Sequence, residues 1–303
     1  MNILLTGATG FLGSHVLKLL LHEGHDLSVL KRSFSRCGRI ADELKKCRAY
    51  DIDQVPMDAI FQEQRFDAVI HCATEYGKNK PADQVVKSNL FFPLRLLEAA
   101  VSAHCPYFIN TDSFFTKQLP ERFDRGQALY SPEYTLSKYQ FREWGRLRAI
   151  EGKVNFINLQ MEHIYGPGDG DEKFVTFLIR TMRSGAGELD LTDGIQIRDF
   201  IYVDDAASAY PAVLNHLKSL SGYCNFEIGT GTSHTVRELV EAVQAELGAV
   251  SRLNFGKKAR TDREMMFSTA RKDSLERIGF VPQVDFETGI KRTVSDFREM
   301  EHT

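Results

Sequence analysis

The fold of this chain is decided by its first residues, Met1-Asn-Ile-Leu-Leu-Thr-Gly7-Ala-Thr-Gly10-Phe-Leu-Gly13-Ser-His-Val16. The short apolar run Ile3–Leu5 predicts a buried parallel strand, and an apolar-periodic helix is expected to begin near Phe11 and run towards Leu21. This order of strand, glycine turn and helix places backbone N–H groups and a helix N-terminus against a pyrophosphate. The stretch therefore predicts a bound dinucleotide, with a purely structural glycine turn as the alternative.

The three glycines serve different purposes in such a turn. Gly7 permits the tight bend, Gly10 lets the cofactor approach the backbone, and Gly13 lets the helix pack close to the strand. All three are therefore expected to line the dinucleotide site.

The next predicted strand, Leu27–Leu30, indicates which dinucleotide is bound. An NAD site usually has a carboxylate at the end of this strand to accept hydrogen bonds from the ribose 2′-OH, whereas an arginine nearby suits a 2′-phosphate. Here Lys31, Arg32 and Ser33 follow the strand. Because a guanidinium grips phosphate through two hydrogen bonds, Arg32 is the stronger candidate. NADP(H) is the expected cofactor; the alternative is that these cations only begin a solvated loop.

Composition excludes several classes of function. The 303 residues suffice for one large domain or for two lobes, and 43% of them are hydrophobic. A formal charge of -3 gives no electrostatic reason to bind nucleic acid, and no apolar run approaches the ~20 residues that span a membrane. Five cysteines without CxxC spacing are expected to be reduced thiols in a cytoplasmic protein. The nine histidines lack the short spacings typical of metal ligands, so no metal site is expected.

Strand-like runs alternate with helical periods, which predicts an α/β fold: a Rossmann-type doubly wound parallel sheet with helices on both faces. The expected strands are Ile3–Leu5, Leu27–Leu30, Ala68–His71, Tyr107–Asn110 and Asn155–Leu159, and the expected helices are Leu12–Leu21, Leu90–Ala103, Tyr134–Ala149 and Val236–Leu247. We expect a dinucleotide-binding domain over residues 1–160. A smaller mixed substrate lobe is expected over residues 161–303, partly interleaved with the last strands of the main sheet.

Tyr134 and Lys138 are a candidate catalytic pair. Residues four apart share one face of a helix, so the phenol and the ammonium can point into the same cleft. A neighbouring ammonium favours the phenolate, which predicts a lowered pKa for Tyr134 and proton exchange near neutral pH. The alternative is an exposed Tyr–Lys pair, because this spacing is common by chance.

Polar groups also follow the predicted strand Tyr107–Asn110. Thr111, Asp112 and Ser113 come directly after it. Open α/β sheets bind their ligands at the carboxyl ends of parallel strands. These three side chains are therefore expected beside the cofactor.

The glycine triplet, Thr111, the Tyr134–Lys138 pair, Tyr165-Gly-Pro-Gly and Arg198-Asp-Phe-Ile-Tyr-Val-Asp-Asp together resemble the extended short-chain dehydrogenase/reductases, the NAD-dependent epimerase/dehydratase family. Within that family the chain most resembles nucleotide-sugar 4-ketoreductases of the CDP-paratose and CDP-abequose synthase type. The resemblance implies a C-terminal lobe for a nucleoside-diphosphate sugar and a Thr/Tyr/Lys catalytic set. It also implies a homodimer, formed through the helix before the Tyr–Lys pair and the helix that contains it.

The resemblance assigns roles to individual positions. Thr111 would hydrogen-bond the reacting substrate oxygen, Tyr134 would supply or remove its proton, and Lys138 would bind the nicotinamide ribose and tune Tyr134. Asn89 would brace the active site. The further implied cofactor contacts are Thr9, Phe11, Leu12, Asp51, Ile52, Cys72, Ala73 and Thr74.

Substrate contacts are implied in the same way. Arg198 and Arg260 match arginines that meet the diphosphate, for which a bidentate guanidinium is suited. The alternative for Arg198 is a surface salt bridge with a nearby aspartate. His163 stands where the family has an asparagine, and is either a donor to the ligand or a packed histidine bonded to backbone. Glu75 and Phe174 are further implied contacts.

One departure narrows the reaction. In the resembling 4,6-dehydratases the catalytic Thr is followed by an Asp and a Glu, whereas here Asp112 is followed by Ser113. A serine hydroxyl cannot take a carbon-bound proton unaided, so elimination of water is not expected. Asp112 is then either a second acid or a local cap.

The expected reaction is NADPH-dependent reduction of the C4 keto group of a nucleoside-diphosphate 4-keto-6-deoxy or 3,6-dideoxy hexose, for deoxysugar biosynthesis. A nucleotide-sugar 4-epimerase with tightly bound NAD is the first alternative. A non-catalytic NADP(H)-binding sensor and a reductase of free carbonyl compounds are the others.

Overall fold

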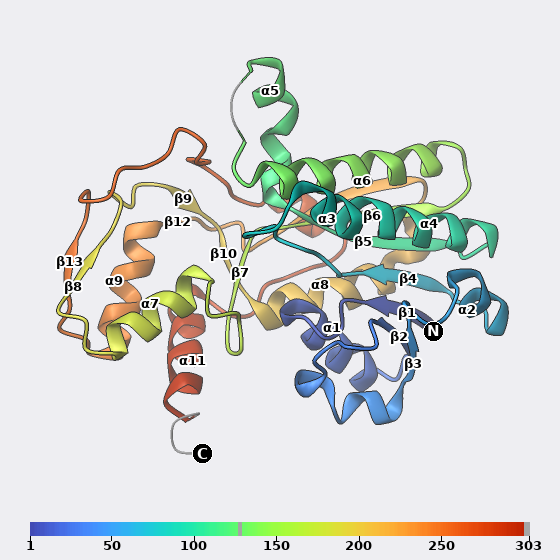
Figure 1. Ribbon diagram of the computed structural model, residues 1–303, viewed down its shortest axis with the longest axis horizontal. Helices are drawn as coiled ribbons and strands as arrows, with labels where there is room; N and C mark the ends of the chain where they lie inside the picture. Colours follow the sequence, from blue (N-terminus) through green and yellow to red (C-terminus); the bar gives the residue numbers. More distant parts are fainter. Residues whose placement is uncertain (127–128, 300–303) are drawn as a thin grey trace.

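The computed structural model describes residues 1–126 and 129–299, and its centre is one sheet of seven strands (Figure 1). The strands are β1 (Asn2–Thr6), β2 (Asp26–Lys31), β3 (Arg48–Asp51), β4 (Ala68–His71), β5 (Tyr107–Ser113), β6 (Asn155–Met161) and β11 (Tyr223–Ile228). They lie in the order β11-β6-β5-β4-β1-β2-β3, and every neighbouring pair is parallel. The chain therefore reverses direction across the sheet between β1 and β4, which is where such folds bind ligands.

Helices cover both faces of this sheet, with α4 and α6 on one face and α1 and α8 on the other (Figure 1). The helices of this part are α1 (Phe11–His22), α2 (Met57–Glu63), α3 (Ala82–Val86), α4 (Phe92–Ser102), α5 (Leu119–Asp124), α6 (Pro132–Ile150) and α8 (Val203–His216). Ile3 and Leu5 of β1 belong to the core beneath α1 and α8, whereas Leu4 belongs to the core beneath α4 and α6. Strands buried on both sides are apolar along their whole length, which explains the uninterrupted run Ile3–Leu5.

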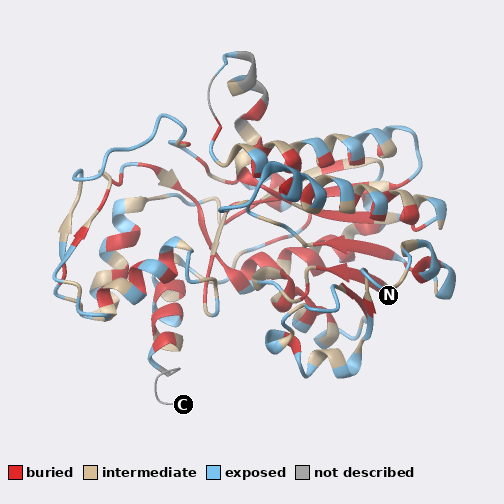
Figure 2. Cartoon of the chain, in the orientation of Figure 1, coloured by how far each residue is buried: buried red, intermediate tan, exposed pale blue. Residues whose placement is uncertain are grey.

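A smaller lobe lies beside the sheet and has a hydrophobic core of its own (Figures 1 and 2). Its elements are β7 (His163–Tyr165), α7 (Phe174–Arg183), β8 (Glu188–Asp190), β9 (Ile197–Arg198), β10 (Phe200–Tyr202), β12 (His234–Thr235), α9 (Val236–Leu247), β13 (Arg252–Asn254) and α11 (Phe286–Glu299). Helix α10 (Lys272–Glu276) instead packs against β11 of the main sheet. Short strand pairs β7–β10, β9–β12 and β8–β13 accompany α7, α9 and α11. Helix α9 begins at a capping box of Thr235 and Glu238, and ends at Gly248 in the left-handed conformation, as its sequence requires.

The predicted α/β fold with a doubly wound parallel sheet is confirmed. Each predicted strand and helix is present, and β5 and β6 continue two or three residues beyond the predicted ends. Two strands of the main sheet were not predicted: β3, where only Tyr50 is buried, and β11, whose buried residues alternate with partly exposed ones. The short strands of the smaller lobe were not predicted either. Strand β11 joins the main sheet and helix α8 packs against it, although both come from the C-terminal part of the chain. The C-terminal part is thus interleaved with the last strands of the main sheet. The domain boundary at residue 160 remains a prediction.

All five cysteines are free thiols. Within the described ranges, no helix combines the length and the apolar character that crossing a membrane demands. The same ranges contain no group of three or more His, Cys, Asp or Glu residues arranged to hold a metal ion.

Candidate active site

The glycine turn joins β1 to α1 with little space to spare. Gly7 has φ +75°, and its carbonyl accepts a hydrogen bond from the Gly10 N–H at 2.9 Å. A Cβ on Gly13 would lie 2.2 Å from the Gly7 oxygen, and one on Gly7 would lie 2.4 Å from the Ala73 nitrogen. Gly10 is the N-cap residue of α1 and has no side chain that could cap the first N–H groups of the helix. These groups are therefore available to a ligand. Such a turn fits an anionic group such as a pyrophosphate.

The three residues after β2 have different environments. Lys31 forms an ion pair with Asp51, which raises the pKa of the lysine. Ser33 donates to Asp53 from both its N–H, at 2.8 Å, and its hydroxyl. Arg32 is exposed, and its guanidinium lies 4.9 Å from the centre of the Phe34 ring. Arg32 is therefore the group of the three that is best placed to meet a ligand phosphate.

Asn89 fixes the segment that follows β4. It lies in a π-helical turn between α3 and α4, and it is buried. Its Oδ1 accepts from the Glu75 N–H at 2.8 Å, while its Nδ2 donates to the Glu75 carbonyl at 2.7 Å and to the Ser137 hydroxyl at 3.3 Å. Asn89 thus braces the ends of β4 and α6 against each other. Burial opposes ionisation of Glu75, but its ion pair with Lys80 leaves the pKa of Glu75 below its usual value.

Tyr134 and Lys138 are both buried, at 6% and 3% exposure, on the face of α6 that reaches the end of β5. The Lys138 ammonium donates to the Thr111 carbonyl. Burial raises the pKa of Tyr134 well above its usual value, and the hydroxyls of Ser113 and Thr74 offset only part of that rise. The lowered pKa expected for Tyr134 is therefore wrong for this structure, because burial, and after it the neighbouring Tyr76, raises the pKa. The phenol stays protonated across the neutral range.

A stack of rings covers the Tyr134 phenol. Tyr76, from the segment after β4, is stacked on Tyr134 with ring centres 5.2 Å apart. The Lys173 ammonium lies 3.2 Å from the centre of the Tyr76 ring, and Phe115 packs edge-on against Tyr134. Lys173 directly precedes α7 in the smaller lobe. The stack thus links the two parts of the molecule directly over the candidate proton donor.

Alternate residues at the end of β5 point to opposite faces of the sheet. The Thr111 hydroxyl lies 2.6 Å from the Tyr210 hydroxyl of α8 and 3.3 Å from the Cys72 sulfur. Asp112 is buried on the other face, where it accepts from Thr116 at 2.9 Å and from Asn158 at 3.0 Å. These partners favour the capping role over the acid role for Asp112.

Two predicted substrate contacts lie at the edge of the smaller lobe. His163 packs between Phe114 and Phe200, with ring centres 4.0 and 5.7 Å away, and its Nδ1 is buried without a hydrogen-bond partner. Burial, together with nearby Arg198, holds the pKa of His163 well below its usual value, so the ring is neutral. His163 is thus packed, as one alternative had it, but its Nδ1 makes no backbone bond. Phe174 begins α7 and is 40% exposed.

Both predicted arginines contact one segment, Met265–Met266. Arg198 is 7% exposed and donates to the Ile197 carbonyl at 2.8 Å and to the Met265 carbonyl. A surface salt bridge for Arg198 is therefore excluded: Asp199 binds backbone N–H groups of the smaller lobe, and Asp204 binds His15. Arg260 is paired with Asp193 at 3.1 Å and donates to the Met266 sulfur at 3.0 Å.

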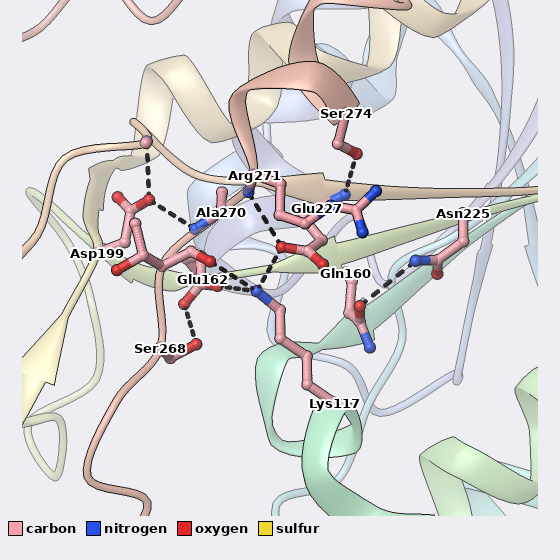
Figure 3. Close-up of polar contacts among 12 residues, drawn as sticks. Lys117, Gln160, Glu162, Asp199, Asn225, Glu227, Ser268, Ala270, Arg271 and Ser274 are labelled. Carbon is pink, nitrogen blue, oxygen red and sulfur yellow. Dashed lines mark hydrogen bonds and ion pairs between the residues drawn. The ribbon is translucent and has the colours of Figure 1, made fainter.

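A partly buried ion-pair network fixes the chain after β5 (Figure 3). The Lys117 ammonium lies between the carboxylates of Glu162 and Glu227, and it also donates to the Thr269 carbonyl at 3.2 Å. Burial raises the pKa of Glu162, although Lys117 and the Ser268 hydroxyl oppose that rise. The network ties the segment below the candidate site to β6, β11 and the chain around Ser268.

The carboxyl of Asp169, in the segment between β7 and α7, provides a pH test of this part of the structure. Burial raises its pKa from 3.8 to about 6, and the Gly170 N–H, 2.8 Å away, only partly opposes this. Between pH 3.8 and about pH 6 the folded state therefore binds more protons at Asp169 than the unfolded state does. The free energy of unfolding consequently falls as the pH rises from 3.8 to about 6. We expect Asp169→Asn to gain stability relative to the wild type between pH 4 and pH 7, measured by urea unfolding at both. If the difference in unfolding free energy between Asp169→Asn and the wild type is the same at pH 4 and pH 7, the raised pKa of Asp169 is contradicted.

Sequence reasoning missed three residues near the candidate site: Tyr76, Tyr210 and Lys117. Their partners lie far along the chain, so no local spacing marks them. Only Tyr76 could have been suspected from the sequence, because it is an aromatic residue two positions after Thr74, close to the end of a predicted strand.

Comparisons with known proteins agree with this geometry. Residues 3–229 match the NAD dependent epimerase/dehydratase family. CDP-abequose synthase of Salmonella muenchen is 34% identical over 97% of this chain and 97% of that protein. CDP-abequose synthase of Salmonella typhimurium is 31% identical, covering 95% of this chain and 96% of that protein. UDP-glucose 4-epimerase of Mycolicibacterium smegmatis is 26% identical and covers 98% and 99% of the two chains.

Solved structures with the same fold are more distant in sequence. UDP-glucose 4-epimerase of Thermotoga maritima, solved with UDP-glucose, gives a TM-score of 0.80 at 24% identity, covering 99% of this chain and 100% of that one. UDP-glucuronic acid 4-epimerase of Bacillus cereus, solved with UDP-glucuronic acid and NAD, gives 0.82 at 21%, with the same coverage. These similarities establish the fold, and they agree with the Rossmann-type sheet described above.

Proposed function

The chain belongs to the NAD dependent epimerase/dehydratase family, and we propose that it reduces the C4 keto group of a nucleoside-diphosphate 4-keto-6-deoxy or 3,6-dideoxy hexose with NADPH. One observation carries the proposal: at the end of β5, Tyr134 is buried, protonated and hydrogen-bonded to the Ser113 and Thr74 hydroxyls, and the buried Lys138 donates to the Thr111 carbonyl. Similarity to two CDP-abequose synthases supports the 4-keto deoxysugar as substrate.

The residues present fit a dinucleotide. A Cβ at Gly7 or Gly13 would collide with backbone, so the turn keeps the bare N–H groups that hold a pyrophosphate. Thr9, Phe11 and Leu12 belong to this cradle, Asp51 and Ile52 would border the adenosine, and Cys72, Ala73 and Thr74 would line the far side. When bound, the nicotinamide would supply the hydride.

The chain's own residues would manage the charge on the substrate oxygen. Reduction places negative charge on that oxygen as C4 gains hydrogen, and Tyr134 gives it the proton. A buried phenol that stays protonated is suited to this donor role. The Thr111 hydroxyl would donate to the same oxygen, a contribution of about 3 kcal/mol to the barrier. Lys138 would hold the ribose and the Thr111 carbonyl in place.

Arg32 tests the choice of cofactor. If its guanidinium binds the 2′-phosphate, Arg32→Ala loses a charge-assisted hydrogen bond, and KM for NADPH should rise about 10- to 100-fold with no change for NADH. Arg36→Ala, an exposed arginine of the same loop, is the matched control. Equal effects of Arg32→Ala on both cofactors would contradict the role.

The reaction itself is tested by NADPH oxidation at 340 nm with a panel of 4-keto-6-deoxy and 3,6-dideoxy nucleotide sugars, beside NADH. Turnover with NADPH on one of them is the expected result and names the nucleotide. A nucleotide-sugar 4-epimerase is the second candidate, favoured by Asp53, a carboxylate near Ser33 of the kind that binds the ribose of NAD. NAD that copurifies with the protein, without NADPH oxidation, would support it.

A homodimer through α4 and α6 is part of the proposal. Three large apolar side chains of α6 are exposed: Trp144 at 40%, Leu147 at 41% and Ile150 at 71%. Such side chains in one row suit a protein interface. Sedimentation at equilibrium would distinguish a dimer from a monomer.

A further inference from the structure

We propose that Tyr210 is a positioning residue that orients the Thr111 hydroxyl for proton donation to the substrate oxygen. This inference rests on the proposed function, in which Thr111 contacts the reacting oxygen. Tyr210 lies on α8, at the opposite side of the sheet from Tyr134, and is separated from Thr111 by 99 positions in the sequence.

The contact is short, and its Tyr210 side is fully buried. The hydroxyls of Tyr210 and Thr111 are 2.6 Å apart, and Tyr210 is 0% exposed. The rest of its ring lies in the core shared by α1, α8 and the sheet, among apolar side chains. A tyrosine hydroxyl in such a core needs a partner, and Thr111 and Cys72 provide it, the sulfur being 3.4 Å away.

The direction of the bonds follows from the number of protons. A threonine hydroxyl has one proton and two lone pairs. In the structure, the Thr111 hydroxyl donates to the Cys72 sulfur, 3.3 Å away. If Tyr210 donates to Thr111, the substrate oxygen can replace that sulfur as the acceptor of the Thr111 proton, while the Cys72 thiol donates to the Tyr210 oxygen. Burial raises the pKa of Tyr210 well above its usual value, so it keeps the proton that this arrangement needs. The result is a chain of donors from Cys72 through Tyr210 and Thr111 to the substrate, in which each bond polarises the next.

The alternative is that Tyr210 only packs in the core, and that its hydroxyl bonds to Thr111 merely because a buried hydroxyl needs a hydrogen-bond partner. The two roles differ in one respect: a positioning residue acts solely through the Thr111 hydroxyl. Removal of that hydroxyl should therefore abolish the effect of changing Tyr210, whereas a packing effect would remain.

The test is a double-mutant cycle in NADPH-dependent reduction. Tyr210→Phe should lower kcat on the order of tenfold with KM unchanged, because one hydrogen bond to the donor is lost. Thr111→Val should lower kcat about 10²- to 10³-fold, and the double variant should be no slower than Thr111→Val alone. In Thr111→Ser, which keeps the hydroxyl, the tenfold loss from Tyr210→Phe should return. Tyr107→Phe, the same change at the other end of β5, is the control.

Three results would overturn the inference: a Tyr210→Phe effect on KM alone, kcat within twofold of the wild type, or a tenfold loss that persists beside Thr111→Val. Thermal unfolding of each variant separates these from misfolding. If Tyr210→Phe does not fold, a kcat of Thr111→Ser as low as that of Thr111→Val would overturn it, because a hydroxyl that Tyr210 orients should donate from serine as it does from threonine. An active wild type with any of these results overturns only the inference. A wild type that neither reduces nor epimerises nucleotide sugars overturns the proposed function as well.

Discussion

Tyr134→Phe is expected to lower kcat of the proposed reduction by about 10²- to 10⁴-fold, the usual contribution of a positioned proton donor. The variant removes one oxygen and keeps the ring, so stacking on Tyr76 and packing against Phe115 are retained. Cofactor binding and the melting temperature should therefore change little. Steady-state kinetics, cofactor titration and thermal unfolding of the same preparation measure the three quantities.

Tyr139→Phe is the matched control for this variant. Tyr139 lies on the same helix and is also partly buried, but its ring contacts the Arg142 guanidinium, 4.5 Å away, instead of the candidate site. It should retain kcat within about twofold. Turnover retained by Tyr134→Phe would mean that the proton comes from another group, and a large loss of stability would mean that the hydroxyl is structural.

Asp199→Ala is expected to lower the free energy of unfolding by about 3 kcal/mol or more, the largest effect on stability that we predict. The side chain is 0% exposed, and its carboxylate accepts four hydrogen bonds. They come from the Thr230 N–H at 2.8 Å, the Thr230 hydroxyl at 2.7 Å, the Gly231 N–H at 2.9 Å and the Ala270 N–H at 3.1 Å. Alanine leaves these donors without a partner in a buried place.

The control for this prediction is Asp42→Ala. Asp42 pairs with Lys45 at 2.7 Å, but the two side chains are 85% and 75% exposed, so the pair should contribute less than about 1 kcal/mol. Urea unfolding followed by circular dichroism gives both values. An Asp199→Ala protein as stable as Asp42→Ala would show that the four donors find water instead.

Local patterns in the sequence predicted most of the fold. The run Ile3–Leu5 is apolar without interruption, as a strand buried on both faces requires, and Val236–Leu247 has the helical period over its whole length. Both appear in the structure as predicted. Strand β3 has one buried side chain, Tyr50, and lies at the edge of the sheet, so nothing in its composition marks it. Strand β11 has no continuous apolar run of the kind seen in Ile3–Leu5, because its buried residues alternate with partly exposed ones.

Parts of the candidate site were predictable for the same reason, and other parts were not. The glycine turn and the Tyr134–Lys138 pair were predictable because each spacing lies within one turn or one helix face, and because the two patterns occur together with Thr111 in one order along the chain. Tyr210 meets Thr111 only because α8 returns beneath the sheet, a contact that follows from the topology. The pKa of Tyr134 was predicted in the wrong direction because charge can be read from the sequence, whereas burial depends on every element around the ring.

The position of β11 in the sheet has a consequence for how the protein is made. β6 ends at Met161 and its neighbour β11 begins at Tyr223, so the ribosome adds roughly sixty residues between them, which takes ~3–12 s. Throughout that interval the apolar edge of β6 is open, with backbone groups that would pair with any available strand. A translational pause there is expected to give aggregates in place of a stable half-protein. Synonymous codons that slow this interval should therefore lower the yield of folded enzyme.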